Sequence, residues 1–131
     1  MPRHLASCLY LLLLCLQLGL AQGVRAQALQ VDALPLGPAG RYSQVLQEAD
    51  GPLTVEQAIS RVQQGLGQPG HQPILNFGIG SRPTWLQLQL FNPTAAPIPV
   101  QVVTGTTWVD HLQRSLVQSG QRLGQWQLGD A

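Results

Sequence analysis

Few side chains in this sequence have the types and spacing that acid–base or nucleophilic chemistry requires. Asp110 and His111 are adjacent, and neighbouring side chains of a strand point to opposite faces, so these two cannot act together on one substrate. No serine lies in the G-x-S-x-G motif of a nucleophile elbow. Because catalysis needs converging titratable groups, we expect no enzymatic activity and no catalytic residue.

Metal and cofactor sites are not indicated either. His71 lies in the glycine- and proline-rich stretch 67–73 with no histidine or cysteine at ligand spacing, which favours an exposed loop imidazole over a metal ligand. Gly78 and Gly80 do not make a nucleotide-binding G-x-G-x-x-G motif, because no third glycine and no following helix complete it. We expect no cofactor and no metal.

Residues suited to binding a small ligand are more numerous. β-Sandwich proteins recognise sugars with an exposed aromatic ring and nearby amide and guanidinium groups, which are the few converging polar groups that a pocket needs. The candidate ligand-binding residues are Arg82, Trp85, Gln87, Gln89 and Trp108, with Trp126 as a further tryptophan. The tryptophans could instead pack in the core, and Trp85 could lie beneath a helix.

The charge of the chain argues against a polyelectrolyte partner. Its formal net charge is +1. Lysine is absent from the sequence, and residues 29–131 carry five arginines against six acidic residues without any basic cluster. Clustered lysine and arginine are the footprint of nucleic-acid binding, so we expect no nucleic-acid partner.

The first 28 residues predict a secretory signal peptide. Arg3 and His4 precede an apolar run over residues 5–20, and Ala26-Gln27-Ala28 supplies the small-x-small pattern that a signal peptidase accepts. A membrane-spanning helix needs about 20 apolar residues, and this run is shorter and interrupted by polar residues. We therefore predict cleavage after Ala28 and a periplasmic or secreted domain over residues 29–131. Both cysteines lie in the leader, so the mature domain would form no disulfide.

The elements that must position these residues are mostly short strands. A capping box of Thr54 and Gln57 starts a helix near residues 54–64, and glycines at 65 and 67 end it. Strands are predicted over residues 29–36, 42–49, 85–90, 98–104, 108–112, 116–119 and 123–128, with 98–104 pairing to 85–90 and a hairpin turn at Gly120. The pattern predicts a mainly β fold, an antiparallel β-sandwich or jelly roll with one short helix insert.

Residues 85–90 alternate between two faces. Leu86, Leu88 and Leu90 share one face, and Trp85, Gln87 and Gln89 share the other. This alternation predicts a half-buried antiparallel strand whose leucines face the core. Turns are predicted at both of its ends, at Asn76-Phe77-Gly78 and at Asn92-Pro93.

These motifs carry a resemblance to a known family. The chain resembles the type 2 extracellular domain of the seven-transmembrane receptors with diverse intracellular signalling modules, over residues 42–130. The matching motifs are Leu53-Thr54-Val55-Glu56-Gln57, Asn76-Phe77-Gly78, Trp85-Leu86-Gln87-Leu88-Gln89-Leu90, Asn92-Pro93, Val109-Asp110 and Gly129-Asp130.

The resemblance implies a periplasmic, jelly-roll-like sensor domain of a bacterial receptor, which recognises a small ligand such as a carbohydrate. In the family such a domain precedes seven membrane helices and an output module such as a histidine kinase or a diguanylate cyclase. Thr84 and Gln87 stand where the family has an aromatic residue and an arginine, so family contacts through these positions are not expected.

Family domains continue for several strands beyond the position of Gly129-Asp130. We therefore expect a truncated or split receptor, attached to the membrane only through a missing portion, with apolar faces and a sheet edge left exposed. The alternative is a stand-alone periplasmic module that binds carbohydrate or another protein.

Overall fold

The computed structural model describes residues 28–104 and 111–129. The predicted signal peptide up to Gln27 lies outside the described residues, as do Trp108 and the first part of the strand predicted over residues 108–112. The described elements are β1 (Leu29–Gln30), a 3-10 turn (Gly40–Tyr42), β2 (Ser43–Gln47), α2 (Val55–Gln63), β3 (Gln68–Pro69), β4 (Thr84–Leu88), β5 (Leu90–Phe91), β6 (Leu112–Gln118) and β7 (Gln121–Leu128).

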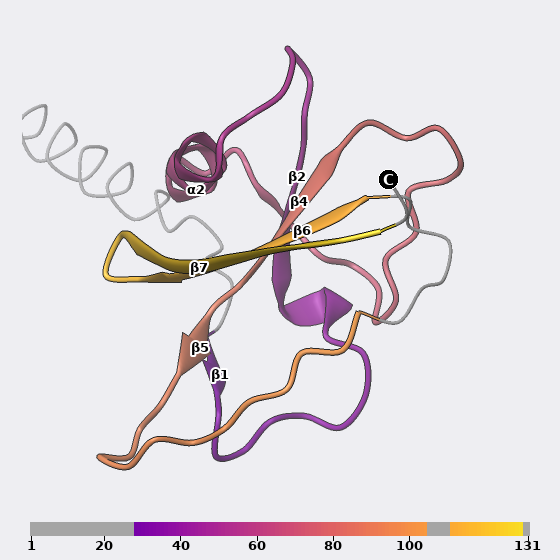
Figure 1. The fold of residues 1–131 in the computed structure, drawn as a ribbon. Helices are drawn as coiled ribbons and strands as arrows, with labels where there is room; N and C mark the ends of the chain where they lie inside the picture. The colour runs from indigo at the N-terminus through magenta and orange to yellow at the C-terminus, as the bar shows by residue number, and fades with distance from the viewer. Residues whose placement is uncertain (1–27, 105–110, 130–131) are drawn as a thin grey trace, which may run out of the picture.

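The strands form three small sheets (Figure 1). Strand β2 is the centre of an antiparallel sheet with β3 on one side and β4 on the other, and β6 and β7 form an antiparallel hairpin. Strands β1 and β5 make a two-residue parallel pair. The predicted class, mainly β with antiparallel sheets and one helix near residues 54–64, is confirmed.

Helix α2 begins with the predicted capping box. The Gln57 backbone amide donates to Thr54 Oγ1 at 3.2 Å, and the Thr54 backbone amide donates to Gln57 Oε1 at 2.9 Å. Each side chain therefore satisfies an amide that the first turn leaves without a helical partner. The buried side of the helix carries Val55 and Ala58, which pack toward β2.

Replacing Thr54 with alanine should lower the free energy of unfolding by about 1 kcal/mol, because the Gln57 amide loses its cap. Thr54→Ser keeps the hydroxyl and is the matched control. Urea denaturation of both variants, followed by circular dichroism, measures the difference. Equal stability of the two variants would show that the cap contributes nothing here.

The core is small, and part of it lies where α2 packs on β2. Leu29, Leu46, Val55 and Ala58 are the buried apolar residues of the described chain, and Ser43, Gln44 and Glu48 are buried with them. Glu48 is only 8% exposed. Its Oε1 accepts hydrogen bonds from the Leu53 backbone amide at 2.9 Å and from Trp85 Nε1 at 2.8 Å. One carboxylate oxygen thus joins the end of β2, the approach to α2 and strand β4.

The prediction that the leucines of residues 85–90 face the core is wrong for two of the three. Leu86 is 54% exposed and Leu90 is 44% exposed, whereas Leu88 is half-buried. The register pairs Trp85 with buried Leu46, and residues paired directly across two strands share a face. The tryptophan and glutamine face is therefore the one that α2 covers.

The neighbours of Gly67 independently place the helix on this face. A Cβ atom added at Gly67 would lie 3.2 Å from Gln44 Oε1 and 3.3 Å from Val62 Cγ2, so the Gln44 side chain is close to α2. Gln44 pairs with Gln87 in the sheet. Trp85 is half-buried on the same face, as the alternative of a tryptophan beneath a helix predicted.

Residues 98–104 form no strand, which corrects the prediction that they pair with residues 85–90. Pro97 and Pro99 lack the amide hydrogens that a ladder needs, and β4 pairs with β2 instead. The backbone carbonyl of Val102 accepts a hydrogen bond from Arg114 Nη1 at 3.2 Å, which ties this segment to β6.

Other boundaries also differ from prediction. The first strand covers only Leu29–Gln30, because a turn in which the Ala33 amide donates to the Gln30 carbonyl ends it. The strand predicted over residues 85–90 is divided into β4 and β5 at Gln89. The stretch 67–73, predicted as a loop, contains β3, which pairs with β2.

The C-terminal hairpin has its turn where the sequence predicted it, although β6 is one strand that includes Leu112 and most of the separately predicted strand 116–119. Ser119 and Gly120 have φ angles of 51° and 78°, as a two-residue hairpin turn with two positive φ values requires. Arg122 reaches α2, where its Nη2 atom lies 3.8 Å from Glu56 Oε1. The pKa of Glu56 is lowered, chiefly by a backbone hydrogen bond at Glu56, and further by Thr54 and Arg122 against a raising effect of desolvation. Both side chains are exposed, so their pairing adds little stability.

Large apolar side chains are exposed on the hairpin as well as on β4 and β5. Trp126 is 51% exposed, and Leu116, Leu123 and Leu128 of the same hairpin are exposed as well. Exposed apolar faces were expected of an incomplete sandwich, although the truncation itself stays a prediction.

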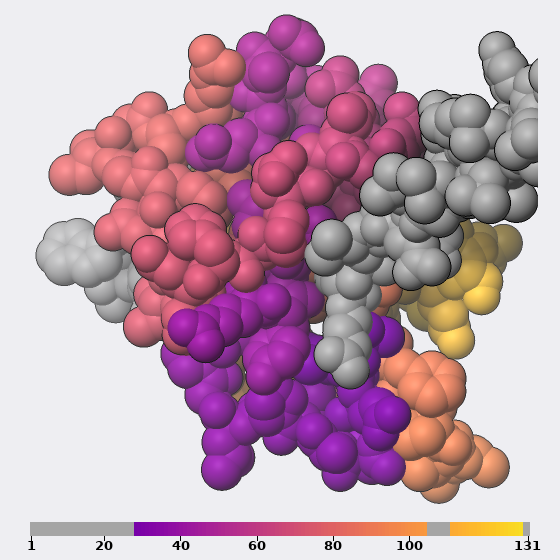
Figure 2. All heavy atoms as spheres, turned by 180° about the vertical axis from the view of Figure 1, so that it is seen from behind, coloured from indigo at the N-terminus to yellow at the C-terminus, as the bar shows by residue number. Residues whose placement is uncertain are grey.

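Two glycines allow the segment after α2 to pack against the start of the domain. The Gly70 amide donates to the Ser43 carbonyl and the Gly40 amide donates to the Pro73 carbonyl, each at 2.9 Å. Figure 2, seen from behind, shows the magenta-to-pink segment after α2 resting on the indigo residues of this region. A Cβ atom at Gly70 would overlap the Gly40 carbonyl oxygen, and one at Gly40 would overlap the carbonyl oxygens of Gln72 and Pro73.

Candidate functional site

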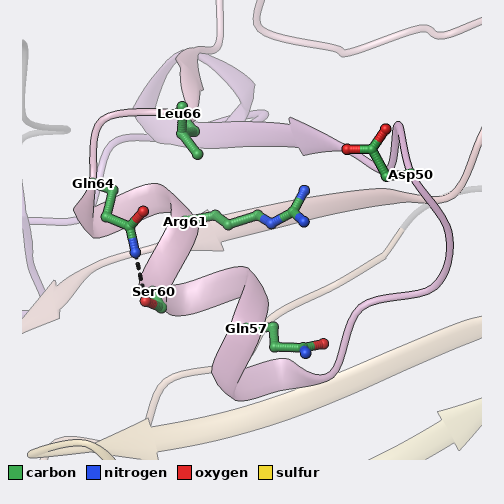
Figure 3. Close-up of a pocket in the computed structure, with 6 residues that line it drawn as sticks. All are labelled: Asp50, Gln57, Ser60, Arg61, Gln64 and Leu66. Carbon is green, nitrogen blue, oxygen red and sulfur yellow. Dashed lines mark hydrogen bonds between the residues drawn. The ribbon is translucent and has the colours of Figure 1, made fainter.

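An open polar depression lies along the exposed side of α2 (Figure 3). Its volume is about 490 Å³, and it is lined by Asp50, Gln57, Ser60, Arg61, Gln64 and Leu66. The lining offers one carboxylate, one guanidinium, two amides and one hydroxyl. This chemistry suits a small polar ligand, since a few placed polar groups fix the orientation of such a ligand in its pocket.

Helical spacing gathers four of these side chains. Gln57, Ser60, Arg61 and Gln64 lie three or four residues apart and therefore share one face of α2. Gln64 Nε2 donates to Ser60 Oγ at 2.9 Å, so the two side chains hold each other on the wall of the depression. The opposite face carries Val55 and Ala58 and is buried, which fixes the orientation of the polar face.

The two charged groups come from different segments. Asp50 belongs to the loop between β2 and α2, and Arg61 belongs to the helix. Figure 3 shows the Arg61 side chain extending along the depression with its guanidinium toward the Asp50 carboxylate. Among the residues that the structure describes, neither side chain forms an ion pair or a hydrogen bond. Neither charge is therefore neutralised by a partner within residues 28–104 and 111–129.

A second, mainly apolar depression adjoins the first at Leu66. Its volume is about 250 Å³, and it lies beside β2 and β3. The lining residues are Val45, Leu46, Gln47, Leu66, Gln68, Pro69, His71, Leu75 and Phe77. Leu66 lines both depressions and is 55% exposed. A polar recess and an apolar recess thus meet at one side chain.

The ligand-binding residues predicted from the sequence do not line either depression. Arg82 and Gln89 are exposed at the two ends of β4, and Gln87 is half-buried beneath α2. The Trp85 indole nitrogen is engaged by Glu48. Trp108 lies outside the described residues. A role for these five residues in binding stays a prediction.

Sequence reasoning missed Asp50 and Arg61 as candidates. Asp50 belongs to the turn Asp50-Gly51-Pro52, and Arg61 is one polar residue on an amphipathic helix, so each looked like an ordinary surface residue. The available signal was the spacing of Gln57, Arg61 and Gln64 on one helical face opposite Val55 and Ala58.

Metal-binding clusters and membrane-crossing helices are both absent from residues 28–104 and 111–129. That part of the chain contains no group of three histidine, cysteine or acidic residues that could hold a metal ion. It also contains no helix of the length and hydropathy that crossing a membrane requires.

Comparison with known protein families finds a match. The model of the family described as 7TMR-DISM extracellular 2 matches residues 40–131. No curated protein matches the chain. The matched range includes every residue that lines the two depressions.

Proposed function

Because the chain belongs to the 7TMR-DISM extracellular 2 family, as its motifs predicted, and is thus an extracytoplasmic domain, we propose that it senses a small ligand for a signal-transduction receptor. In this proposal, residues 1–28 direct export to the periplasm, and residues 29–131 bind the ligand. The transmembrane and output modules of the receptor report the binding. The family match over residues 40–131 is the observation that carries the proposal.

The polar depression beside α2 is the proposed place of binding. Its carboxylate and guanidinium have no partners within the described residues, so a ligand does not have to displace an existing ion pair to reach them. Asp50 lies on the loop before α2 and Arg61 on the helix itself. A ligand that contacts both groups favours one arrangement of the helix and the loop, which is how binding can shift a conformational equilibrium.

Ligand-induced stabilisation of the full chain tests this function. We expect one member of a panel of sugars and amino acids to raise the thermal unfolding midpoint, since a ligand at 100 times its Kd stabilises a domain by about 2.7 kcal/mol. Arg61→Gln should remove the shift. Arg41→Gln changes an exposed arginine outside the depression and should leave the shift intact.

The Arg82→Gln variant distinguishes the depression from the residues predicted on β4. Loss of the thermal shift in Arg82→Gln but not in Arg61→Gln would move the binding site to β4. The absence of a shift with every member of the panel would count against a sensor of these ligands.

The receptor context has its own test. We expect the gene that encodes this domain to encode seven apolar spans and a kinase or cyclase module as well. A gene that encodes neither would contradict the receptor and leave the ligand-binding domain to act alone.

A further inference from the structure

We propose that the joined depressions accept a small zwitterion with an apolar body, of which an apolar α-amino acid is the simplest class. This inference rests on the proposed function and names the ligand of the same site. It follows from two charges that have no partner among the described residues, from the adjoining apolar recess and from the residue that both recesses share.

The charges of the polar depression indicate which charged groups the ligand carries. The polar depression holds one carboxylate, from Asp50, and one guanidinium, from Arg61, and neither is paired within the described residues. A carboxylate favours an ammonium group, and a guanidinium favours a carboxylate, which it can bind through two parallel hydrogen bonds. A molecule that carries both groups neutralises both side chains at once. An α-amino acid has this arrangement at one end.

The adjoining recess indicates that the rest of the ligand is apolar. Val45, Leu46, Leu75 and Phe77 contribute apolar surface to a volume of about 250 Å³. One water occupies roughly 30 Å³ of the liquid, so this recess admits a side chain of several carbon atoms. Leu66 lines both recesses, so the apolar recess adjoins the polar one at this side chain.

The lining also argues against a sugar in the polar depression. Sugar recognition uses an aromatic ring for stacking, and none of the six residues that line this depression is aromatic. Phe77 belongs to the apolar recess, where it meets a hydrocarbon body rather than a hydroxylated ring. The two recesses together have a volume within the roughly 300–1,000 Å³ of small-molecule sites.

Isothermal titration of the full chain with defined probes tests the inference. L-Leucine and L-phenylalanine should bind. N-acetyl-L-leucine lacks the ammonium, L-leucine methyl ester lacks the carboxylate, and L-serine lacks the apolar body. Each of these three probes should bind about 10- to 100-fold more weakly than L-leucine, because each loses one charge-assisted or apolar contact.

Two variants assign each end of the ligand to its residue. Asp50→Asn should weaken L-leucine binding about ten-fold or more and reduce the preference for L-leucine over N-acetyl-L-leucine. Arg61→Gln should likewise weaken L-leucine binding and should reduce the preference for L-leucine over L-leucine methyl ester. Asp32→Asn and Arg41→Gln change exposed residues outside both recesses and are the matched controls, with affinities equal to that of the unchanged chain.

The outcomes separate this inference from the proposed function. Binding of a sugar but not of L-leucine, with the sugar lost in Arg61→Gln, would overturn the zwitterion and leave the sensor in place. Failure of every sugar and amino acid to bind would overturn both. L-Leucine binding that neither Asp50→Asn nor Arg61→Gln weakens would overturn the assignment to these recesses.

Discussion

Replacing Glu48 with alanine should lower the free energy of unfolding by about 2–4 kcal/mol, because two hydrogen bonds to a buried carboxylate disappear together. The Leu53 amide and the Trp85 indole both donate to the same Glu48 oxygen. The change leaves two donors without their acceptor between β2, β4 and the approach to α2. A small domain buries a modest share of its surface, so a loss of this size is a large part of its stability.

Chemical denaturation of the full chain measures the effect, and two variants sharpen it. Glu48→Gln keeps a carbonyl oxygen in place and should cost about 1 kcal/mol, since only the charge is lost. Trp85→Phe removes the indole donor while Leu53 keeps its acceptor. The double variant Glu48→Ala with Trp85→Phe should be less destabilised than the sum of the single variants, with a coupling of about 0.5–3 kcal/mol.

Exposed Glu56 is the control for an acidic residue of the same length. Its side chain lies on the surface of α2 with Arg122 at 3.8 Å, and Glu56→Ala should change the stability by no more than about 1 kcal/mol. Equal costs for Glu48→Ala and Glu56→Ala would refute the central role of the Glu48 contacts.

Replacing Gly70 with alanine should destabilise the domain by about 3 kcal/mol through overpacking. The new methyl group would overlap the Gly40 carbonyl oxygen and would lie 3.0 Å from Ser43 Oγ. A carbonyl oxygen is part of the backbone and cannot rotate away as a side chain does. The backbone must therefore separate, which weakens the hydrogen bond from the Gly70 amide to the Ser43 carbonyl.

Gly51→Ala separates steric overlap from backbone strain. Gly51 has a φ of +113°, and a Cβ atom added there would meet open space, so alanine should cost about 1–2 kcal/mol from conformation alone. Thermal unfolding of both variants gives the comparison. A Gly70→Ala variant as stable as Gly51→Ala would show that the two segments are not held as closely as described.

Local signals in the sequence predicted the helix and the hairpin turn well. The capping box joins residues three apart, and the hairpin turn is set by two neighbouring residues, Ser119 and Gly120. In both cases the partners are so close in the chain that their types alone determine the geometry. The turn at Asn76 is of the same kind, since its Oδ1 accepts from the Gly78 amide at 2.9 Å.

The buried face of β4 could not be predicted from the same pattern. Alternation divides a strand into two faces, but it does not say which face the helix covers. That choice depends on the pairing of Trp85 with Leu46 and on the return of the chain after α2. The absence of a strand over residues 98–104, in contrast, could have been predicted. Pro97 and Pro99 have no amide hydrogens, which argues against a paired strand there.

The candidate site was hidden for a related reason. Asp50 and Arg61 are separated by a turn and most of a helix, and each has the appearance of a solvated surface residue. They meet in one depression only because α2 packs on the sheet beside the loop that carries Asp50. The spacing of Gln57, Arg61 and Gln64 marks the polar face of the helix, but it does not show that Asp50 lies beside that face.

The pairing pattern also bears on the order in which the chain folds. The hairpin of β6 and β7 closes through two residues, and such closures take about 1–10 μs. Strand β1 must find β5 across most of the domain, and β2 must find β4 across α2 and the long loop after it. Contacts between distant parts of a chain form late, because loop closure costs entropy before the contacts compensate for it. We therefore expect the helix and the hairpin to form early, and the recesses beside α2 to exist only after the slowest step of folding.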